Sequence, residues 1–355
     1  EVAQGEHRLR LEYEPEKSAR EAQGVQVEDV KVQLYQPDHP LYLVIQHAPI
    51  IYGRRKAGFS DVPLVMSYEQ EPAEEGPRLR YTVIFSNEDG GTPPEGLMAR
   101  WGRLTDIEWI YEVTLDEAGE PVAAFYQGDG HEMVKFRGEW EGMHPLLRVV
   151  TKNNMVTDRG RSDYRFALVP LTPLPDDHSR EEVMDRFPWT YAVMAAEWAR
   201  EGQEHPTDPD TPAVGDPRDY LYIEFLVQEP ESHPCPVICS RGAWAVRLRD
   251  DPTWYSSDHG QEKLRVRLRN WHRVTIELPP GTQAEQITQL RFQAFIERKS
   301  SLCCAITLAR VSRAFLLDEE YKPGPSLLTH DEPITLDTDP DTETPAEIVF
   351  EVRGR

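Results

Sequence analysis

Hydrophobic and polar residues alternate along two segments between positions 79 and 115. In the first segment, Tyr81, Val83 and Phe85 fall on one face, and a period of two residues is typical of a half-buried β-strand. The second segment alternates in the same way and places four apolar side chains on one face: Ile107, Trp109, Tyr111 and Val113. We therefore predict two strands whose apolar faces turn toward a core.

The opposite face of the second segment carries acidic residues. Asp106 and Glu108 are two positions apart, so a strand that rises about 3.3 Å per residue holds their carboxylates about 6.5 to 7 Å apart. Glycoside hydrolases use two carboxyl groups about 5 to 9.5 Å apart. Asp106 and Glu108 are therefore a candidate catalytic pair, and the alternative is a solvated acidic face of an antiparallel sheet.

Between these two strands lies the sequence SNEDGGT. Gly90 and Gly91 permit a turn with positive φ, and the polar side chains around them offer oxygen atoms. Calcium prefers oxygen ligands, so Asn87 and Asp89 are candidate calcium ligands. Turns closed by Asn and Asp side chains explain the same residues without an ion.

Short strand patterns separated by turns recur along the rest of the chain. The apolar run LYLVIQHAPIIY at 41–52 predicts a buried strand. Four large side chains recur at helical spacing and predict a helix packed on a sheet: Phe187, Tyr191, Met194 and Trp198. Residues 204–218 are rich in proline and aspartate without periodicity, as expected for a linker.

These patterns predict a mainly β protein with two antiparallel β-sandwich or jelly-roll domains and one helical insert at about 179–201. The N-terminal β domain covers 1–175, the insert and linker cover 176–218, and the C-terminal β-sandwich covers 219–355.

The net charge of the chain limits the classes of partner that it is expected to bind. Of 355 residues, 62 are acidic and 39 are basic, which gives a net charge of −23. Such a balance disfavours nucleic acid and anionic membranes, and no apolar run approaches the roughly 18 residues of a membrane span. The chain begins at Glu1 without a signal-like apolar segment, which fits a processed product, so we expect a secreted or cell-envelope protein.

The cysteines and histidines do not decide whether the protein binds a metal or forms disulfide bonds. The four cysteines allow three pairings, and their spacing is not a usual zinc pattern: Cys235, Cys239, Cys303 and Cys304. Three histidines lie in the 41–52 run or beside glycine turns and form a metal site if they converge: His47, His131 and His144.

A basic segment interrupts the acidic chain. Residues 241–313 hold 13 Lys or Arg against seven Asp or Glu. Within it, Arg265, Arg267 and Arg269 alternate with apolar residues and so share one strand face. Guanidinium groups bind carboxylates and sulfates through two hydrogen bonds, so this face suggests an acidic polysaccharide. Alternatively, the basic face meets the acidic first domain.

The sequence contains no nucleophile elbow, P-loop, dinucleotide fingerprint or H-E-x-x-H motif. We therefore predict a secreted polysaccharide-active protein, a glycoside hydrolase that uses Asp106 and Glu108. Trp101 is the candidate sugar platform because Trp109 is expected in the core.

Two alternatives remain open at the level of sequence. The first is a non-catalytic carbohydrate-binding or envelope-associated protein with structural calcium. The second is an enzyme of another class, either a metal-dependent enzyme that uses the histidines or a polysaccharide lyase. In the lyase, the arginine face stabilises an enolate and His272 or Tyr255 moves the proton.

Overall fold

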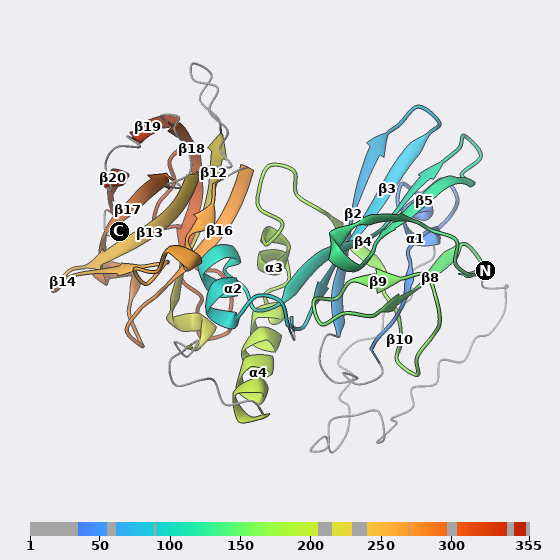
Figure 1. Cartoon of the computed structure of the whole chain (residues 1–355), viewed down its shortest axis with the longest axis horizontal. Coiled ribbons are helices and arrows are strands. Elements are labelled where there is room, and N and C mark those ends of the chain that lie inside the picture. The colour runs from blue at the N-terminus through green and yellow to red at the C-terminus, as the bar shows by residue number, and fades with distance from the viewer. Residues whose placement is uncertain are drawn as a thin grey trace.

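The computed structural model describes most of the chain, namely residues 35–54, 62–88, 90–204, 215–228, 240–268, 270–296, 304–338 and 344–352. Strands dominate this part of the chain and form four sheets (Figure 1). The prediction of a mainly β protein with few helices is confirmed.

The N-terminal half forms two of these sheets. The six-stranded sheet has the order β11 (Pro170–Pro173), β2 (Pro63–Pro72), β3 (Pro77–Phe85), β4 (Asp106–Leu115), β5 (Pro121–Gln127) and β6 (Met133–Lys135). The five-stranded sheet has the order β10 (Arg165–Ala167), β1 (Ile50–Tyr52), β8 (His144–Val149) and β7 (Trp140–Glu141), with β9 (Val156–Thr157) paired to β8. Side chains from both sheets share one buried core, for example Ile51 and Leu147 with Tyr81 and Val113, so the two sheets form a sandwich.

The C-terminal half forms a second sandwich. One sheet has the order β16 (Asn270–Glu277), β12 (Tyr220–Gln228), β18 (Cys304–Phe315) and β19 (Ile334–Thr338). The other has the order β14 (Asp251–Ser256), β13 (Ser240–Leu248), β17 (Ile287–Ile296) and β20 (Ala346–Glu351), with β15 (Val266–Arg267) paired to β13. Phe225 lies 5.6 Å from Trp244 and 5.6 Å from Phe292, measured between ring centroids, so these three aromatic rings join the two sheets. The predicted boundaries at residues 175 and 218 stay a prediction.

Two details of the N-terminal sandwich differ from expectation. The sheets are not purely antiparallel, because β1 pairs with β8 and β11 pairs with β2 in parallel. The run 41–52 is not one strand either, because it forms helix α1 (Tyr42–Gln46) followed by β1. Val44 of α1 is fully buried, and its carbonyl oxygen accepts a hydrogen bond of 2.8 Å from the Tyr81 hydroxyl. A continuous apolar run has no period that distinguishes a buried helix from a buried strand.

The alternation of β4 breaks at a β-bulge. Tyr81 pairs with Tyr111, but the next residue, Thr82, pairs with Trp109, so Ile110 is the extra residue. Tyr111 therefore faces the interior of the sandwich, whereas Trp109 lies on the other face and is half-buried. The prediction that Trp109 shares the face of Tyr111 is wrong because the two-residue period fails at the bulge.

Three helices lie between the two sandwiches (Figure 1): α2 (Pro94–Trp101), α3 (Glu182–Arg186) and α4 (Trp189–Glu204). They share a buried apolar cluster with residues of both sandwiches, including Ile84 and Ile107 of the N-terminal one and Tyr222 and Phe315 of the C-terminal one. The predicted helical stripe packs in this cluster, as expected: Phe187, Tyr191, Met194 and Trp198. Of the helices in the described ranges, none is long and apolar enough to cross a membrane.

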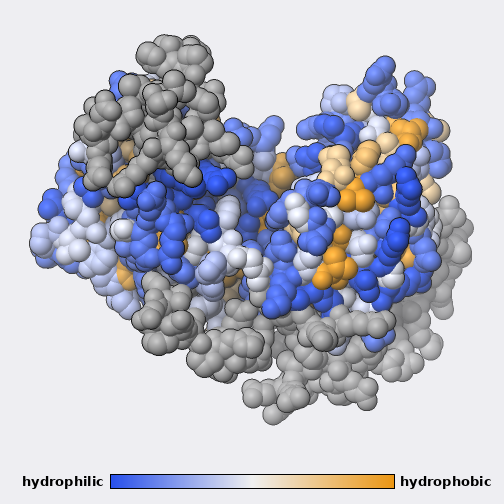
Figure 2. Space-filling model, viewed as in Figure 1, coloured by the Kyte–Doolittle hydropathy of each residue, from blue (hydrophilic) through white to orange (hydrophobic). Residues whose placement is uncertain are grey.

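The surface is hollowed where the two sandwiches meet, and mainly hydrophilic residues line this hollow (Figure 2). α2 connects β3 to β4 of the N-terminal sandwich and yet packs against β16 of the C-terminal one. The Thr275 hydroxyl of β16 donates a hydrogen bond of 2.7 Å to the Met98 carbonyl of α2. The segment that joins β3 to β4 therefore bridges the two halves of the protein.

Candidate functional site

The candidate carboxylates lie side by side at the start of β4. Asp106 pairs with Phe85 and Glu108 pairs with Val83, and both partners belong to the interior core of the sandwich. Because residues paired across two strands share a face, Asp106 and Glu108 share one face, as the sequence predicted. This face is the interior one, whereas the alternation placed the pair opposite the core; that part of the prediction is wrong because the bulge at Ile110 reverses the faces of the residues before it. Asp106 is buried, with 2% of its surface exposed, whereas the Glu108 side chain keeps 13% exposed.

Asn154 and Arg103 hold the Asp106 carboxylate. The Asn154 amide nitrogen Nδ2 donates one hydrogen bond of 2.9 Å to Asp106 Oδ2 and another of 3.0 Å to the Asn87 carbonyl oxygen. Arg103 Nη1 lies 3.7 Å from Asp106 Oδ1. Asn154 is fully buried and has a φ of 58°, a left-handed conformation that asparagine tolerates better than most residues.

Burial controls the proton affinity of Asp106. It raises the pKa of this carboxyl group from 3.8 to about 7, and the nearby Glu108 carboxylate adds to the rise. Arg103 and the hydrogen bond from Asn154 oppose the change but do not cancel it. Asp106 therefore exchanges its proton near neutral pH, which is the range that general acid–base catalysis requires.

The Glu108 side chain contacts residues at the end of β5 and in the turn between β5 and β6. Gln127 Nε2 donates a hydrogen bond of 2.9 Å to Glu108 Oε2 and lies 2.6 Å from His131 Nδ1. The imidazole of His131 is mostly exposed, and its Nδ1 lies 3.9 Å from Glu108 Oε2. Burial raises the pKa of Glu88, and Glu108 also contributes to this rise. Three carboxyl groups therefore act on one another at this site.

The residues considered for metal binding do not form one cluster. His47 Nε2 lies 3.1 Å from the Gly119 carbonyl oxygen and His144 Nδ1 lies 2.8 Å from the Ala48 carbonyl oxygen, away from the Glu108 contact of His131. Among all described residues, no group of three or more His, Cys, Asp or Glu side chains is arranged to hold a metal ion. The three-histidine site therefore finds no support.

The predicted calcium site in the loop after β3 also finds no support among the described residues. Asn87 is buried and offers its carbonyl oxygen to Asn154, while Asp89 lies outside the described residues. Glu88 accepts a hydrogen bond of 3.0 Å from the Thr92 backbone amide instead. This contact closes a turn, which is the alternative that needs no ion.

A buried network of charges connects the carboxylate pair to the C-terminal sandwich. Arg103 contacts Asp106 and also donates a hydrogen bond of 3.2 Å from Nε to Glu181 Oε1. Burial alone would raise the pKa of Glu181, but Arg103, Arg180 and Arg273 outweigh it and hold this pKa below its usual range. The carboxylate of Glu181 therefore stays ionised, stabilised by Arg103 just before β4 and by Arg273 of β16.

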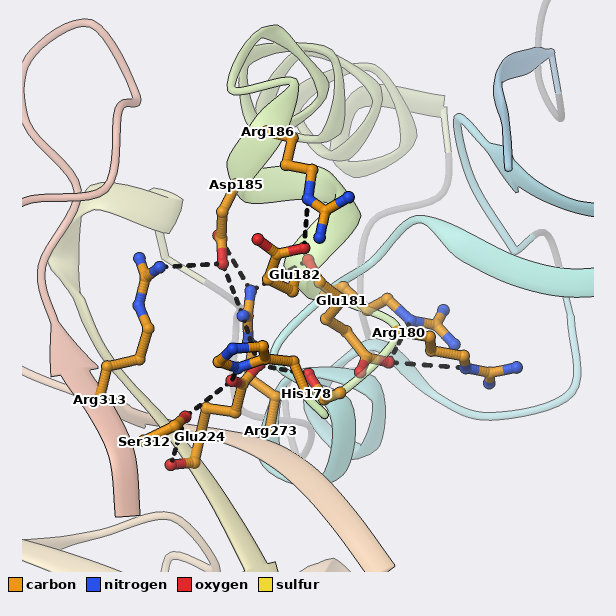
Figure 3. A network of polar contacts seen from close by, with 12 residues as sticks. His178, Arg180, Glu181, Glu182, Asp185, Arg186, Glu224, Arg273, Ser312 and Arg313 are labelled. Carbon is orange, nitrogen blue, oxygen red and sulfur yellow. Dashed lines mark hydrogen bonds and ion pairs between the residues drawn. The ribbon is translucent and has the colours of Figure 1, made fainter. Parts of the chain in front are cut away.

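Arg273 of β16 is the centre of this network (Figure 3). Its side chain is fully buried, and Nη2 lies 2.6 Å from Asp185 Oδ2 and 2.7 Å from Glu224 Oε2. Glu224 also accepts hydrogen bonds of 2.6 Å from the Ser179 hydroxyl and 2.7 Å from the Ser312 hydroxyl. Burial alone would raise the pKa of Glu224, but Arg273 and the hydroxyl groups lower it to about 2. These side chains come from β16, β12, β18, α3 and the segment that precedes α3, so the network joins helix and sheet and serves the architecture of the protein.

The predicted row of arginines is divided between two places. Arg265 lies over the Phe295 ring, 3.5 Å from its centroid, and its Nε donates a hydrogen bond of 3.0 Å to Asp258 Oδ2. Arg267 lines a different pocket, together with Trp101 of α2. Arg269 lies outside the described residues. One continuous arginine face therefore stays a prediction: β15 covers only Val266–Arg267, and Arg265 and Arg267 line different pockets.

Several residues of this site carry a weak sequence signal or none. Glu224 interrupts the apolar strand YLYIEFLVQ, and a carboxylate in such a run indicates a buried ion pair. Asn154 and Gln127 are ordinary polar residues in sequence, and only the fold brings them to the carboxylates. Among the cysteines, Cys304 begins β18, and the other three lie outside the described residues.

Known proteins give no guide to the role of this site. No family model, curated protein or solved structure matches the chain. A functional conclusion therefore rests on the chemistry and geometry of the side chains themselves.

Proposed function

We propose that this protein hydrolyses glycosidic bonds in a polysaccharide, with Asp106 and Glu108 as its carboxyl pair. One observation carries the proposal: Asp106 is enclosed with a pKa of about 7, and Glu108 lies beside it on the same strand face and reaches the surface. Enclosure is how a catalytic carboxylic acid keeps its proton near neutral pH.

The two groups suit the two halves of the reaction. Asp106 donates its proton to the glycosidic oxygen as the bond from that oxygen to the anomeric carbon breaks. Glu108 then accepts a proton from the water molecule whose oxygen bonds to the anomeric carbon. Asn154 and Arg103 orient Asp106 in this scheme.

The surroundings of the pair suit a ligand rich in hydroxyl groups. Oδ1 of Asn154 and Oε1 of Gln127 are buried and have no hydrogen-bond partner within the described ranges. A buried acceptor without a donor costs free energy, and hydroxyl groups of a sugar are suitable donors.

The test is hydrolysis of a panel of neutral and acidic polysaccharides, followed as new reducing ends. We expect Asp106→Asn and Glu108→Gln to lower the rate at least about 100-fold, because general acid–base groups contribute about 10²- to 10⁴-fold. We also expect the rate of the unaltered protein to fall as the pH rises above about 7, where Asp106 loses its proton.

Glu112→Gln is the matched control. Glu112 lies on the same strand, pairs across to Arg80 and accepts a hydrogen bond of 2.8 Å from its Nε, so its loss leaves the carboxyl pair in place. The proposal fails if no polysaccharide in the panel is cleaved, or if the Glu108→Gln protein cleaves as fast as the unaltered protein.

A further inference from the structure

A pocket of about 760 Å³ opens between α2 and the C-terminal sandwich. Its volume lies within the range of about 300 to 1,000 Å³ that is typical of small-molecule sites. Arg100 and Trp101 of α2 form one wall, and Arg241, Lys263 and Arg267 of the C-terminal sandwich line the rest. His272 of β16 also lines the pocket.

The pocket is basic in a strongly acidic protein. Four of its lining side chains are Lys or Arg, and Glu262 is the one carboxylate among the lining residues, while the whole chain has a net charge of −23. Burial lowers the pKa of Arg100, and the positive charges of Arg241 and Arg267 lower it further. These guanidinium groups therefore repel one another, and a bound anion offsets the repulsion.

Hydrogen bonds and a ring contact hold the walls of this pocket in place. Arg100 Nε donates a hydrogen bond of 3.1 Å to the Gly96 carbonyl oxygen, and its guanidinium carbon lies 4.7 Å from the centroid of the Trp101 ring. The bond from Thr275 to Met98 fixes α2 on β16. A site that is already formed loses less entropy when a ligand binds.

We infer that this pocket binds an anionic sugar, one that carries at least two sulfate, phosphate or carboxylate groups. Arg241 and Arg267 supply planar donors that match such oxyanions, and Trp101 supplies an aromatic side chain for the sugar ring. The Arg267 side chain has no hydrogen bond or ion pair with any residue in the described part of the chain, so its guanidinium donors are available to a ligand in the pocket. The inference is independent of the proposed hydrolysis, because it concerns other side chains and is tested by binding alone.

The experiment is isothermal titration calorimetry of the full chain at low salt concentration with four probes. Two probes are anionic sugars, a sulfated tetrasaccharide and a tetragalacturonate; inorganic pyrophosphate presents phosphate without a sugar, and a neutral tetrasaccharide presents a sugar without charge. We expect at least one anionic sugar to bind more tightly than both pyrophosphate and the neutral sugar. Its affinity is expected to fall as salt rises, because charge supplies much of the attraction.

A double variant and a matched control assign the binding to this pocket. Arg241→Gln with Arg267→Gln is expected to weaken binding of the anionic sugar about 10- to 100-fold, since hydrogen bonds to charged groups are the strong ones. Arg249→Gln with Arg310→Gln removes the same charge elsewhere, because Arg249 binds the Glu285 carbonyl and Arg310 pairs with Asp331, and it is expected to retain affinity.

Thermal unfolding of both double variants confirms that they are folded before the titration is interpreted. The inference is overturned if neither anionic sugar binds, if pyrophosphate or the neutral sugar binds as tightly, or if the two double variants lose affinity equally.

Discussion

Replacing Asp106 with asparagine is expected to change how the stability of this protein depends on pH. Asn has nearly the same shape as Asp but carries no charge at any pH. The substitution therefore removes one ionisation and leaves the packing at the start of β4 nearly unchanged. Lost contacts with Arg103 and Asn154 add a constant offset, and the ionisation adds a term that varies with pH.

The size of the varying term follows from the pKa. The pKa of Asp106 is 3.8 without the fold and about 7 within it, so the folded state holds the proton more tightly than the unfolded state. Stability from this group is fully present below pH 3.8 and is lost as the pH rises to about 7. At about 1.4 kcal/mol for each pH unit, the complete loss is about 4 kcal/mol. About 2 kcal/mol of this loss falls between pH 5.5 and pH 8.5.

Urea unfolding at pH 5.5 and pH 8.5 measures the effect. The lower pH stays above the sequence pI of about 4.9, where a small net charge would promote precipitation. Relative to the unaltered protein, the Asp106→Asn protein is expected to gain about 2 kcal/mol in the free energy of unfolding between the two pH values. Glu117→Gln, at an exposed turn position, is the control and is expected to show no such change.

The reasoning is refuted if the difference between the Asp106→Asn and unaltered proteins is the same at both pH values. That result would mean that the Asp106 carboxyl group ionises in the folded protein as it does in the unfolded chain. The proposal that Asp106 acts as an acid near neutral pH would then be refuted as well.

Two further predictions concern the join between the sandwiches, and urea unfolding tests both. Arg273→Met is expected to lower the free energy of unfolding by about 3 to 5 kcal/mol, because it leaves the buried carboxylates of Glu224 and Asp185 without the arginine that they share. Arg313→Met, at a partly exposed position, is expected to cost about 1 kcal/mol or less. Gly102→Ala is expected to cost about 1 kcal/mol or more, because the glycine ends α2 with a φ of 63° and an added Cβ would lie 3.0 Å from Thr275 Cγ2. Equal losses for the two arginine variants, or an unchanged Gly102→Ala protein, would contradict these assignments.

The strands of the N-terminal sandwich were predictable as far as their alternation is regular. Tyr81, Val83 and Phe85 share the interior face, as their spacing predicts. The same rule failed for Trp109 because a bulge depends on how two strands pair, and one strand alone carries no sign of it. It failed again at 41–52, where apolar residues in every position remove the period on which the rule depends.

The candidate site was predictable only in part. Two carboxylates two positions apart on a strand share a face by geometry, and no other part of the chain is needed for that inference. The groups that set their chemistry come from elsewhere: Asn154 follows β8, and Gln127 ends β5. Their contacts with the carboxylates form only in the complete fold, so no local sequence pattern predicts them.

The segment from β3 to β4 connects the parts of the fold that carry the carboxyl pair and the basic pocket. It leaves the N-terminal sandwich, packs α2 against β16 and returns as the strand that carries Asp106. Glu88, at its start, acts electrostatically on both Asp106 and Arg100. Arg273 and the shared apolar cluster then fix α3 and α4 on the C-terminal sandwich. These buried contacts cross between the two halves, so the proposed roles of the carboxyl pair and of the basic pocket depend on the same contacts between the sandwiches.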